Sequence, residues 1–204
     1  SAGIKDHLAA GRDYPGFLTE RSSRVANPAQ SLQAITVGSV AYRLYESTGW
    51  NSFAAENGEP SSFSRSGLGI WGVIKPEVVE FAGDYLRCPG DPVLLATPAE
   101  GRDCYPELVR STLQSPGPPY DRDEIGTSFA APKVTHVAAM LQRILPDEPC
   151  LLYRALIVQS ARWPEWTRTA DDLDRMKTLR CLGYGVPSVE RATTNTDYRT
   201  TFIS

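Results

Sequence analysis

The residues best suited to chemistry lie in the stretch Gly126-Thr127-Ser128-Phe129-Ala130-Ala131-Pro132. Spacings of three and four between apolar residues predict a helix that begins here. Ser128 would then stand at the start of that helix. A serine in this place is either an N-cap, accepting from an amide of the first turn, or a nucleophile whose oxyanion is stabilised by the free amides and the helix dipole. The apolar stripe consists of Ala130, Val134, Val137, Ala138, Leu141, Ile144 and Leu145.

Two neighbouring residues fit either role of the serine. Pro132 is tolerated because the first turn of a helix needs no internal donors. Gly126 leaves room for another backbone to approach, as a peptide substrate would. The residues alone therefore leave a cap and a nucleophile both open.

The order Gly-Thr-Ser-x-Ala-x-Pro resembles the serine motif of the subtilisin-like serine peptidases, or subtilases. Other segments from about residue 27 to 192 resemble the same family in the same order. The resemblance implies a serine endopeptidase that acts on a peptide or protein through an acyl-enzyme. Ser128 would be the nucleophile, its backbone amide one oxyanion donor, and Gly126, Thr127 and Pro132 supporting members of the motif. The matching segments are residues 34–41 (A-I-T-V-G), 62–67 (S-F-S-R-S-G), 75–83 (K-P-E-V) and 183–192.

Serine acyl transfer also needs a base, an orienting carboxylate and a further oxyanion donor. The family's D-[ST]-G and H-G-T-x-V-A-G motifs do not occur, and the only histidines are His7 and His136. His136 follows Ser128 by eight residues, about 12 Å along the predicted helix, so a packing or surface role is expected. His7 is expected on the surface. The Asp and His are therefore expected upstream, in an N-terminal half that would be a partner of this chain.

The segment Ser1-Ala2-Gly3 resembles the family's S-A-G-N, with Ile4 in place of the oxyanion Asn near Gly3. This departure supports an alternative, a catalytically inactive subtilase-like domain that binds peptide or a partner protein. An α/β-hydrolase esterase is disfavoured because its nucleophile elbow requires G-x-S-x-G. Serine-carboxyl peptidases fit less well than subtilases because of the Phe-Ala-Ala-Pro run.

The fold expected is α/β, a mainly parallel sheet with helices on both faces, as part of a subtilisin-like domain. Strands are predicted at 34–41 and 75–83, and helices from Ser128 to Leu145, from Pro149 to about Ala161, and at 189–192. Ala130, Ala131 and Pro132 are expected to pack against the sheet. Residues 1–31, 42–62 and 84–125 are expected to be loops, with a short strand at 109–113 and a charged link at 171–177. The domain is placed at 1–192, with an insertion at about 84–108, its part 88–108 lying on the surface, and an extension at 193–204.

Composition narrows the range of partners. The chain has 204 residues, 41% hydrophobic and 22% charged, with net charge −3. These values suit one α/β domain and favour neither nucleic acid nor a membrane as partner. No cofactor is indicated; calcium is frequent in the family, but no carboxylate-rich loop points to it. A Cys88–Cys104 disulfide is an alternative to reduced thiols, and the lack of a cysteine framework favours the cytoplasm.

Overall fold

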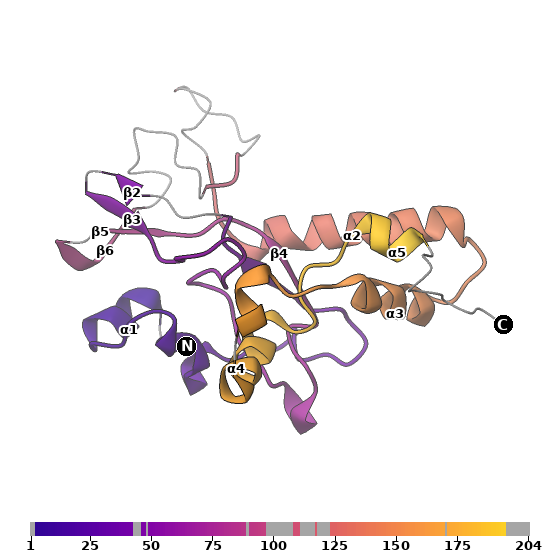
Figure 1. Cartoon of the computed structure of the whole chain (residues 1–204), viewed down its shortest axis with the longest axis horizontal. Helices are drawn as coiled ribbons and strands as arrows, with labels where there is room; N and C mark the ends of the chain where they lie inside the picture. Colours follow the sequence, from indigo (N-terminus) through magenta and orange to yellow (C-terminus); the bar gives the residue numbers. More distant parts are fainter. Residues whose placement is uncertain are drawn as a thin grey trace.

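The computed structural model describes residues 3–42, 46–47, 49–88, 90–96, 108–110, 117, 123–169 and 171–194. Figure 1 shows the course of the chain. The elements in chain order are α1 (Ile4–Ala9), η1 (Gly16–Thr19), η2 (Arg21–Ser23), β1 (Val37–Val40), β2 (Glu46–Ser47), β3 (Trp50–Ser52), η3 (Ile70–Gly72), β4 (Val78–Phe81), β5 (Leu86–Cys88), β6 (Asp91–Ala96), α2 (Thr127–Ile144), α3 (Cys150–Ser160), η4 (Glu165–Thr169), α4 (Asp172–Leu182) and α5 (Val189–Thr193).

A parallel pair of strands, β1 and β4, forms the centre of the fold, with Val37 opposite Val78 and Val40 opposite Phe81. Both strands lie inside the ranges predicted from their apolar, β-branched sequences. Val78 and Val79 are fully buried, and successive side chains of a strand point to opposite faces. Each of the two valines therefore belongs to a different core cluster.

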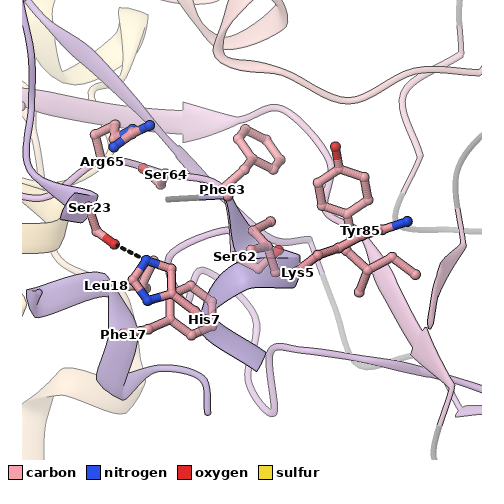
Figure 2. A pocket seen from close by; sticks show the side chains of 13 residues that line it. Lys5, His7, Phe17, Leu18, Ser23, Ser62, Phe63, Ser64, Arg65 and Tyr85 are labelled. Carbon is pink, nitrogen blue, oxygen red and sulfur yellow. Dashed lines mark hydrogen bonds between the residues drawn. The ribbon is translucent and has the colours of Figure 1, made fainter. Parts of the chain in front are cut away.

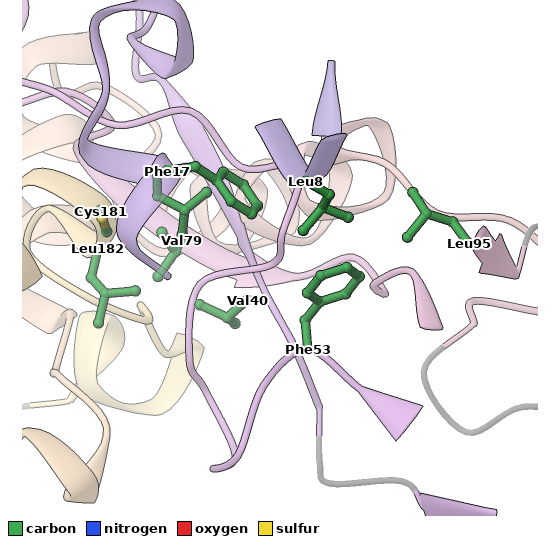
Figure 3. Close-up of a cluster of buried hydrophobic side chains, with 9 residues drawn as sticks. Leu8, Phe17, Val40, Phe53, Val79, Leu95, Cys181 and Leu182 are labelled. Atoms are coloured by element: carbon green, nitrogen blue, oxygen red, sulfur yellow. The ribbon is translucent and has the colours of Figure 1, made fainter. Parts of the chain in front are cut away.

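Helices cover both faces of this pair, as predicted. On one face Val78 packs with residues of α2, α3 and α5, and these three helices lie together at the right of Figure 1. On the other face Val40 and Val79 pack with residues of α1, η1 and α4, as Figure 3 shows. The members of this second cluster are Leu8, Phe17, Leu18, Val40, Phe53, Val79, Leu95, Cys181 and Leu182.

The expectation of a mainly parallel sheet is wrong for the described residues. The parallel sheet there has two strands, and a separate antiparallel sheet has four, in the order β2-β3-β5-β6. The α/β class is confirmed, with small parallel and antiparallel sheets. Two of the antiparallel strands, β2 and β3, lie in the range 42–62 that the sequence predicts to be loop.

The hairpin of β5 and β6 corrects the prediction for residues 84–108. Prolines suggested an irregular surface segment, but Leu86 is fully buried and Leu95 is 3% exposed within the cluster of Figure 3. This part of the range therefore contributes to the core. Residues 97–107, including Cys104, lie outside the described residues, as do 111–113 and 195–204. Cys88 is a free thiol, as are Cys150 and Cys181.

Two further helical regions were predicted to be irregular. The range 1–31 contains α1, η1 and η2, and the predicted charged link at 171–177 is the first half of α4. The Asp171 side chain caps α4 by accepting from the Asp174 amide at 2.8 Å. Gly183 ends α4 with φ +56°, and a Cβ there would lie 2.1 Å from the Pro76 carbonyl oxygen, so only glycine fits this close approach.

Candidate active site

Ser128 is the second residue of α2 and its side chain is exposed. The residue before the helix, Gly126, has φ +149°, a conformation that residues with a Cβ rarely adopt. The prediction that a helix begins at Ser128 and ends near Leu145 is confirmed to within one residue, because α2 runs from Thr127 to Ile144. Ser128 is not the N-cap, and no side-chain cap bond is made at this helix start.

The loop that presents Ser128 is fixed on two sides. The Gly126 amide donates to the carbonyl of Ala82, just beyond β4, at 3.0 Å. Glu124 and Val109 exchange backbone hydrogen bonds of 2.8 and 2.9 Å. These bonds tie the start of α2 to the carboxyl end of the central strand pair, where open α/β sheets commonly place their sites.

An ion pair between a buried carboxylate and a half-exposed arginine supports the same loop. The Asp123 side chain is 2% exposed, and its Oδ1 lies 2.8 Å from Nε of Arg110. The charged run at 121–124 did not predict this pair, because the tertiary fold alone brings Arg110 and Asp123 together. The ion pair holds the loop three residues before Gly126.

The first turn of α2 offers hydrogen-bond donors to a ligand. The first amides of a helix have no acceptor within the helix. The Phe129 amide donates to the Gly126 carbonyl at 2.9 Å, whereas no residue in the described ranges accepts from the Ser128 amide. A negative charge that develops beside this amide would be stabilised by the donor and by the positive end of the helix dipole.

The packing of the small residues after Ser128 differs in part from prediction. Ala130 is fully buried against the sheet side of the helix. Ala131 and Pro132 are exposed, so the expectation that they pack against the sheet is wrong. Their positions on the helix turn them about 100° and 200° away from Ala130, given 3.6 residues per turn.

Neither histidine is bonded to Ser128 in the part of the chain that the structure describes. His136 is exposed on α2, as expected. His7 is 1% exposed, so its prediction as a surface residue is wrong. Its ring stacks on Phe17 with centroids 5.1 Å apart, and its Nε2 lies 3.3 Å from the hydroxyls of both Ser22 and Ser23.

The environment of His7 favours its neutral form. Burial lowers the pKa of His7, and the positive charge of Arg12 lowers it further. The carboxylates of Glu20 and Asp6 act in the opposite direction with smaller effect. At neutral pH this imidazole is therefore an uncharged member of the core beneath α1.

The position that resembles the family's oxyanion Asn carries no side-chain donor. Gly3 is the N-cap of α1 and Ile4 its first residue. The Ile4 side chain packs against the cluster of Figure 3. In the described residues the Ser128 amide is thus the candidate oxyanion donor, and Ile4 adds none.

The family model Peptidase_S8, described as "Subtilase family", matches residues 8–185. The chain belongs to the subtilase family. The match covers the serine loop, the central strands and α2 to α4. Membership of this family implies a subtilisin-like fold for this subtilase. Its candidate nucleophile, Ser128, lies at the helix start that the family motif indicated.

One relative extends the comparison. The uncharacterized protein y4bN of Sinorhizobium fredii (strain NBRC 101917 / NGR234) is 29% identical over 208 residues, covering 94% of this chain and 45% of the relative. This subtilase chain therefore spans less than half the length of that protein. The relative's printed name gives no activity.

A buried charged cluster of the subtilase chain was missed from sequence. The Lys75 ammonium, in a side chain 1% exposed, donates to the carbonyls of Ser31 and Ala34 at 2.7 and 2.9 Å. It also lies 2.6 Å from Oε1 of Glu77, which Arg154 approaches to 2.5 Å. The cluster joins the start of β4 to the segment before β1 and to α3.

The described residues show neither a metal site nor a membrane-spanning helix. They contain no group of three or more His, Cys, Asp or Glu side chains placed to hold a metal ion. None of the helices in the described ranges is both long and apolar enough to cross a bilayer.

Proposed function

We propose that this subtilase chain carries the nucleophile of a serine endopeptidase, with Ser128 forming the acyl-enzyme. The exposed hydroxyl of Ser128, held at the start of α2 beside an unused amide, is the observation that carries this proposal. In the reaction the Ser128 oxygen attacks the carbonyl carbon of a peptide bond and passes its proton to a base. The carbonyl oxygen becomes an oxyanion and accepts from the Ser128 amide.

The base and its orienting carboxylate come, in this proposal, from an upstream segment of a longer polypeptide. His7 is buried and neutral, and His136 stands about two turns along α2, so neither reaches the Ser128 hydroxyl without rebuilding a helix. The exposed face of α2 that carries Ala131 and Pro132 offers a surface for that segment. The substrate is a peptide or protein, bound in extended form by strand pairing near the cleft.

The test is hydrolysis of a casein substrate by the longest natural polypeptide that contains this chain. Ser128→Ala is expected to abolish cleavage, because a triad without its nucleophile keeps only a residual rate. Thr135→Ala is the matched control, since Thr135 is exposed on the same helix and its hydroxyl donates to the Ala131 carbonyl. Unchanged cleavage by Ser128→Ala would contradict the proposal.

A second candidate function rests on Ile4. An apolar side chain in place of the oxyanion Asn removes a donor worth about 10²–10³ in rate, a magnitude measured in subtilisin, which is itself a subtilase. The second candidate is a peptide-binding subtilase domain without activity. The decisive protein is a longer polypeptide that carries both an Asp and a His upstream. If that polypeptide binds a casein peptide and does not cleave it, the second candidate is favoured.

A further inference from the structure

A cavity of about 570 Å³ lies between α3 and the segments that precede β1 and β4, and Leu151, Leu32 and Val73 line it from these three parts of the chain. It is distinct from the cavity of Figure 2, which is lined by Gly3 and Ile4 and so belongs to the candidate active site. None of the described residues that line it belongs to α2 or to the loop before that helix. What binds here is therefore independent of the peptidase activity proposed above.

The surface around this cavity is free of charged residues over two long segments. Residues 26–36 and 66–74 contain no Asp, Glu, Lys or Arg. The two segments lie side by side, because the Ile70 amide donates to Oε1 of Gln30 at 2.8 Å. Depletion of charge distinguishes the core of a protein–protein interface from the rest of a protein surface. The two segments therefore have the charge pattern of an interface core.

The charged side chains in the cavity wall already have partners. Oε1 of Glu77 lies 2.6 Å from the Lys75 ammonium and 2.5 Å from a guanidinium nitrogen of Arg154. Arg154 also donates Nη1 to the Leu32 carbonyl. Covering this wall would therefore leave no charge without an ion-pair partner among the described residues that line it, and an unpaired buried charge is the main cost of burying charged surface.

An exposed tryptophan stands beside the cavity, on η3. Trp71 is 85% exposed, and its φ of +57° is the only positive φ of a non-glycine residue in the described ranges. A bulky residue in this left-handed region is an outlier, whereas glycine adopts it readily. The turn projects from the body at the foot of Figure 1, in magenta. Packing within the described chain thus gives no reason for a tryptophan here, and the indole is suited to a contact with a partner.

The apolar patch is large enough for an interface. Leu32, Ile70, Leu151 and Tyr184 are also exposed, and three of them line the cavity. With Trp71 they expose on the order of 500 Å², comparable to the largest apolar patch of a typical monomer. An interface of standard size buries about 800 Å² on each partner, which the patch reaches together with the uncharged segments around it.

We propose that this face binds a second copy of the same chain through a two-fold axis. The face carries a protruding indole and, one residue further along the chain, a hollow that Gly72 and Val73 line. In a two-fold interface, residue i of one copy contacts residue j of the other and the reverse. Trp71 of each copy then fills the cavity of the other copy, so that one surface supplies both the side chain and its receptacle.

The distribution of charge favours a second copy over a lipid surface. Each copy has a net charge of −3, so most orientations of two copies bring like charges together. The face made by 26–36 and 66–74 avoids this repulsion because neither segment is charged. Faces that bind membranes combine apolar side chains with Lys and Arg, and these two segments contain neither.

The first test is sedimentation velocity of the longest natural polypeptide that contains this chain, with Ser128→Ala to prevent self-cleavage. A dimer with a micromolar dissociation constant is expected. Trp71→Gly should raise that constant about 100-fold or more, because both copies lose their central aromatic residue, and glycine suits the backbone at this position. Leu151→Gln, on a different element, should raise it about tenfold or more.

The matched control is Leu173→Gln, because Leu173 on α4 is 68% exposed, close to the 71% of Leu151, and does not line the cavity. This variant should change the dissociation constant by about twofold or less. Equal effects of Leu151→Gln and Leu173→Gln, or a monomer at every concentration up to about 100 μM, would overturn the proposal.

A second test identifies what covers Trp71. The photo-cross-linker p-benzoylphenylalanine replaces Trp71 in a mixture of ¹⁴N- and ¹⁵N-labelled polypeptides. The expected product joins a light chain to a heavy chain, with the adduct among the residues that line the cavity, such as Leu151 and Tyr184. A cross-link within one polypeptide would show that another segment of the same chain covers this face, and binding of a monomer to phosphatidylserine vesicles through Trp71 would identify a lipid surface. Either result would contradict the proposed dimer.

Discussion

Lys75→Met is expected to destabilise the fold by about 3–5 kcal/mol, the range for breaking a buried ion pair from one side. The substitution keeps the length of the side chain and removes the ammonium. Lys75 is 1% exposed, and its Nζ bonds the carbonyls of Ser31 and Ala34 and the Thr36 hydroxyl as well as Glu77. The three acceptors other than Glu77 are part-buried, so water replaces the lost donor only in part.

The remaining interactions decide the size of the effect. In the variant, Glu77 still accepts hydrogen bonds from Arg154 at 2.5 Å and from the Thr36 amide at 2.7 Å, so its negative charge remains paired. The two part-buried carbonyls lose their charged donor, and a hydrogen bond to a charged group contributes about 1.5–3 kcal/mol. Loss of two such bonds already gives the lower part of the range, and reduced pairing of Glu77 gives the rest.

Urea unfolding followed by circular dichroism measures the change. Lys177→Met is the matched control, since its pair with Asp174 joins side chains that are 55% and 56% exposed, and exposed pairs contribute about 0.3–0.5 kcal/mol. The double variant Lys75→Met, Glu77→Leu is expected to lose less free energy of unfolding than the sum of the losses in the two single variants. A loss below 1 kcal/mol for Lys75→Met would refute the reasoning, because it would mean that the ammonium is solvated.

Further predictions concern packing, pH and thiol reactivity. Ala130→Leu is expected to lower the free energy of unfolding in urea by about 1–3 kcal/mol, because the larger side chain overpacks a buried position. Ala131→Leu, at an exposed position, should change it by about 0.5 kcal/mol or less. Equal effects of the two variants would contradict the burial of Ala130 and the exposure of Ala131. Because the pKa of His7 is lowered in the folded state, the unfolded state binds more protons, so stability is complete above about pH 6.5 and falls as pH drops below it. His7→Gln should flatten this dependence, and an unaltered profile would show that other groups cause it. Burial raises the pKa of Cys181 to about 11. Iodoacetamide at pH 8 should therefore modify the exposed Cys150 first and Cys181 only after unfolding. Early modification of Cys181, detected by mass spectrometry of the peptides, would contradict this prediction.

The parts of the fold with strong periodic sequence were predictable. The predicted stripe of α2 is confirmed at Val134, Val137 and Leu141, which are buried, and is wrong at Ile144, which is 50% exposed. The β-branched run of β1 and the apolar start of β4 likewise predicted two buried strands. The candidate residue Ser128 followed from the motif and from its place before this stripe, because a helix start dictates which amides are free.

The missed elements lack that periodicity. Helix α4 has a strongly charged sequence, and its usable signals were the Asp171 cap and the terminal Gly183, both of which stood in the sequence. The β5–β6 hairpin was hidden by its prolines, although Leu86 and Leu95 reach the core. The structure of terminal residues and of hairpin strands is determined by tertiary packing rather than by the local sequence pattern.

Buried polar residues were the least predictable. His7 was expected on the surface, and nothing in the sequence indicated the buried partners of Lys75 and Asp84. Each is buried because residues distant in sequence supply its partners, as Ser62 does for Asp84. No rule of spacing along the chain foresees such pairing.

The central claim, that Ser128 is a nucleophile activated from outside this chain, is tested most directly by one labelling measurement. A fluorophosphonate is added to the 204-residue chain and to the longest natural polypeptide that contains it, and the adduct is mapped by mass spectrometry. The account predicts an adduct on Ser128 in the longer polypeptide only, because a serine without its base reacts about 10⁶-fold more slowly, as measured in the subtilase subtilisin. An adduct on Ser128 in the 204-residue chain alone, or an adduct on another serine in the longer polypeptide, would contradict it.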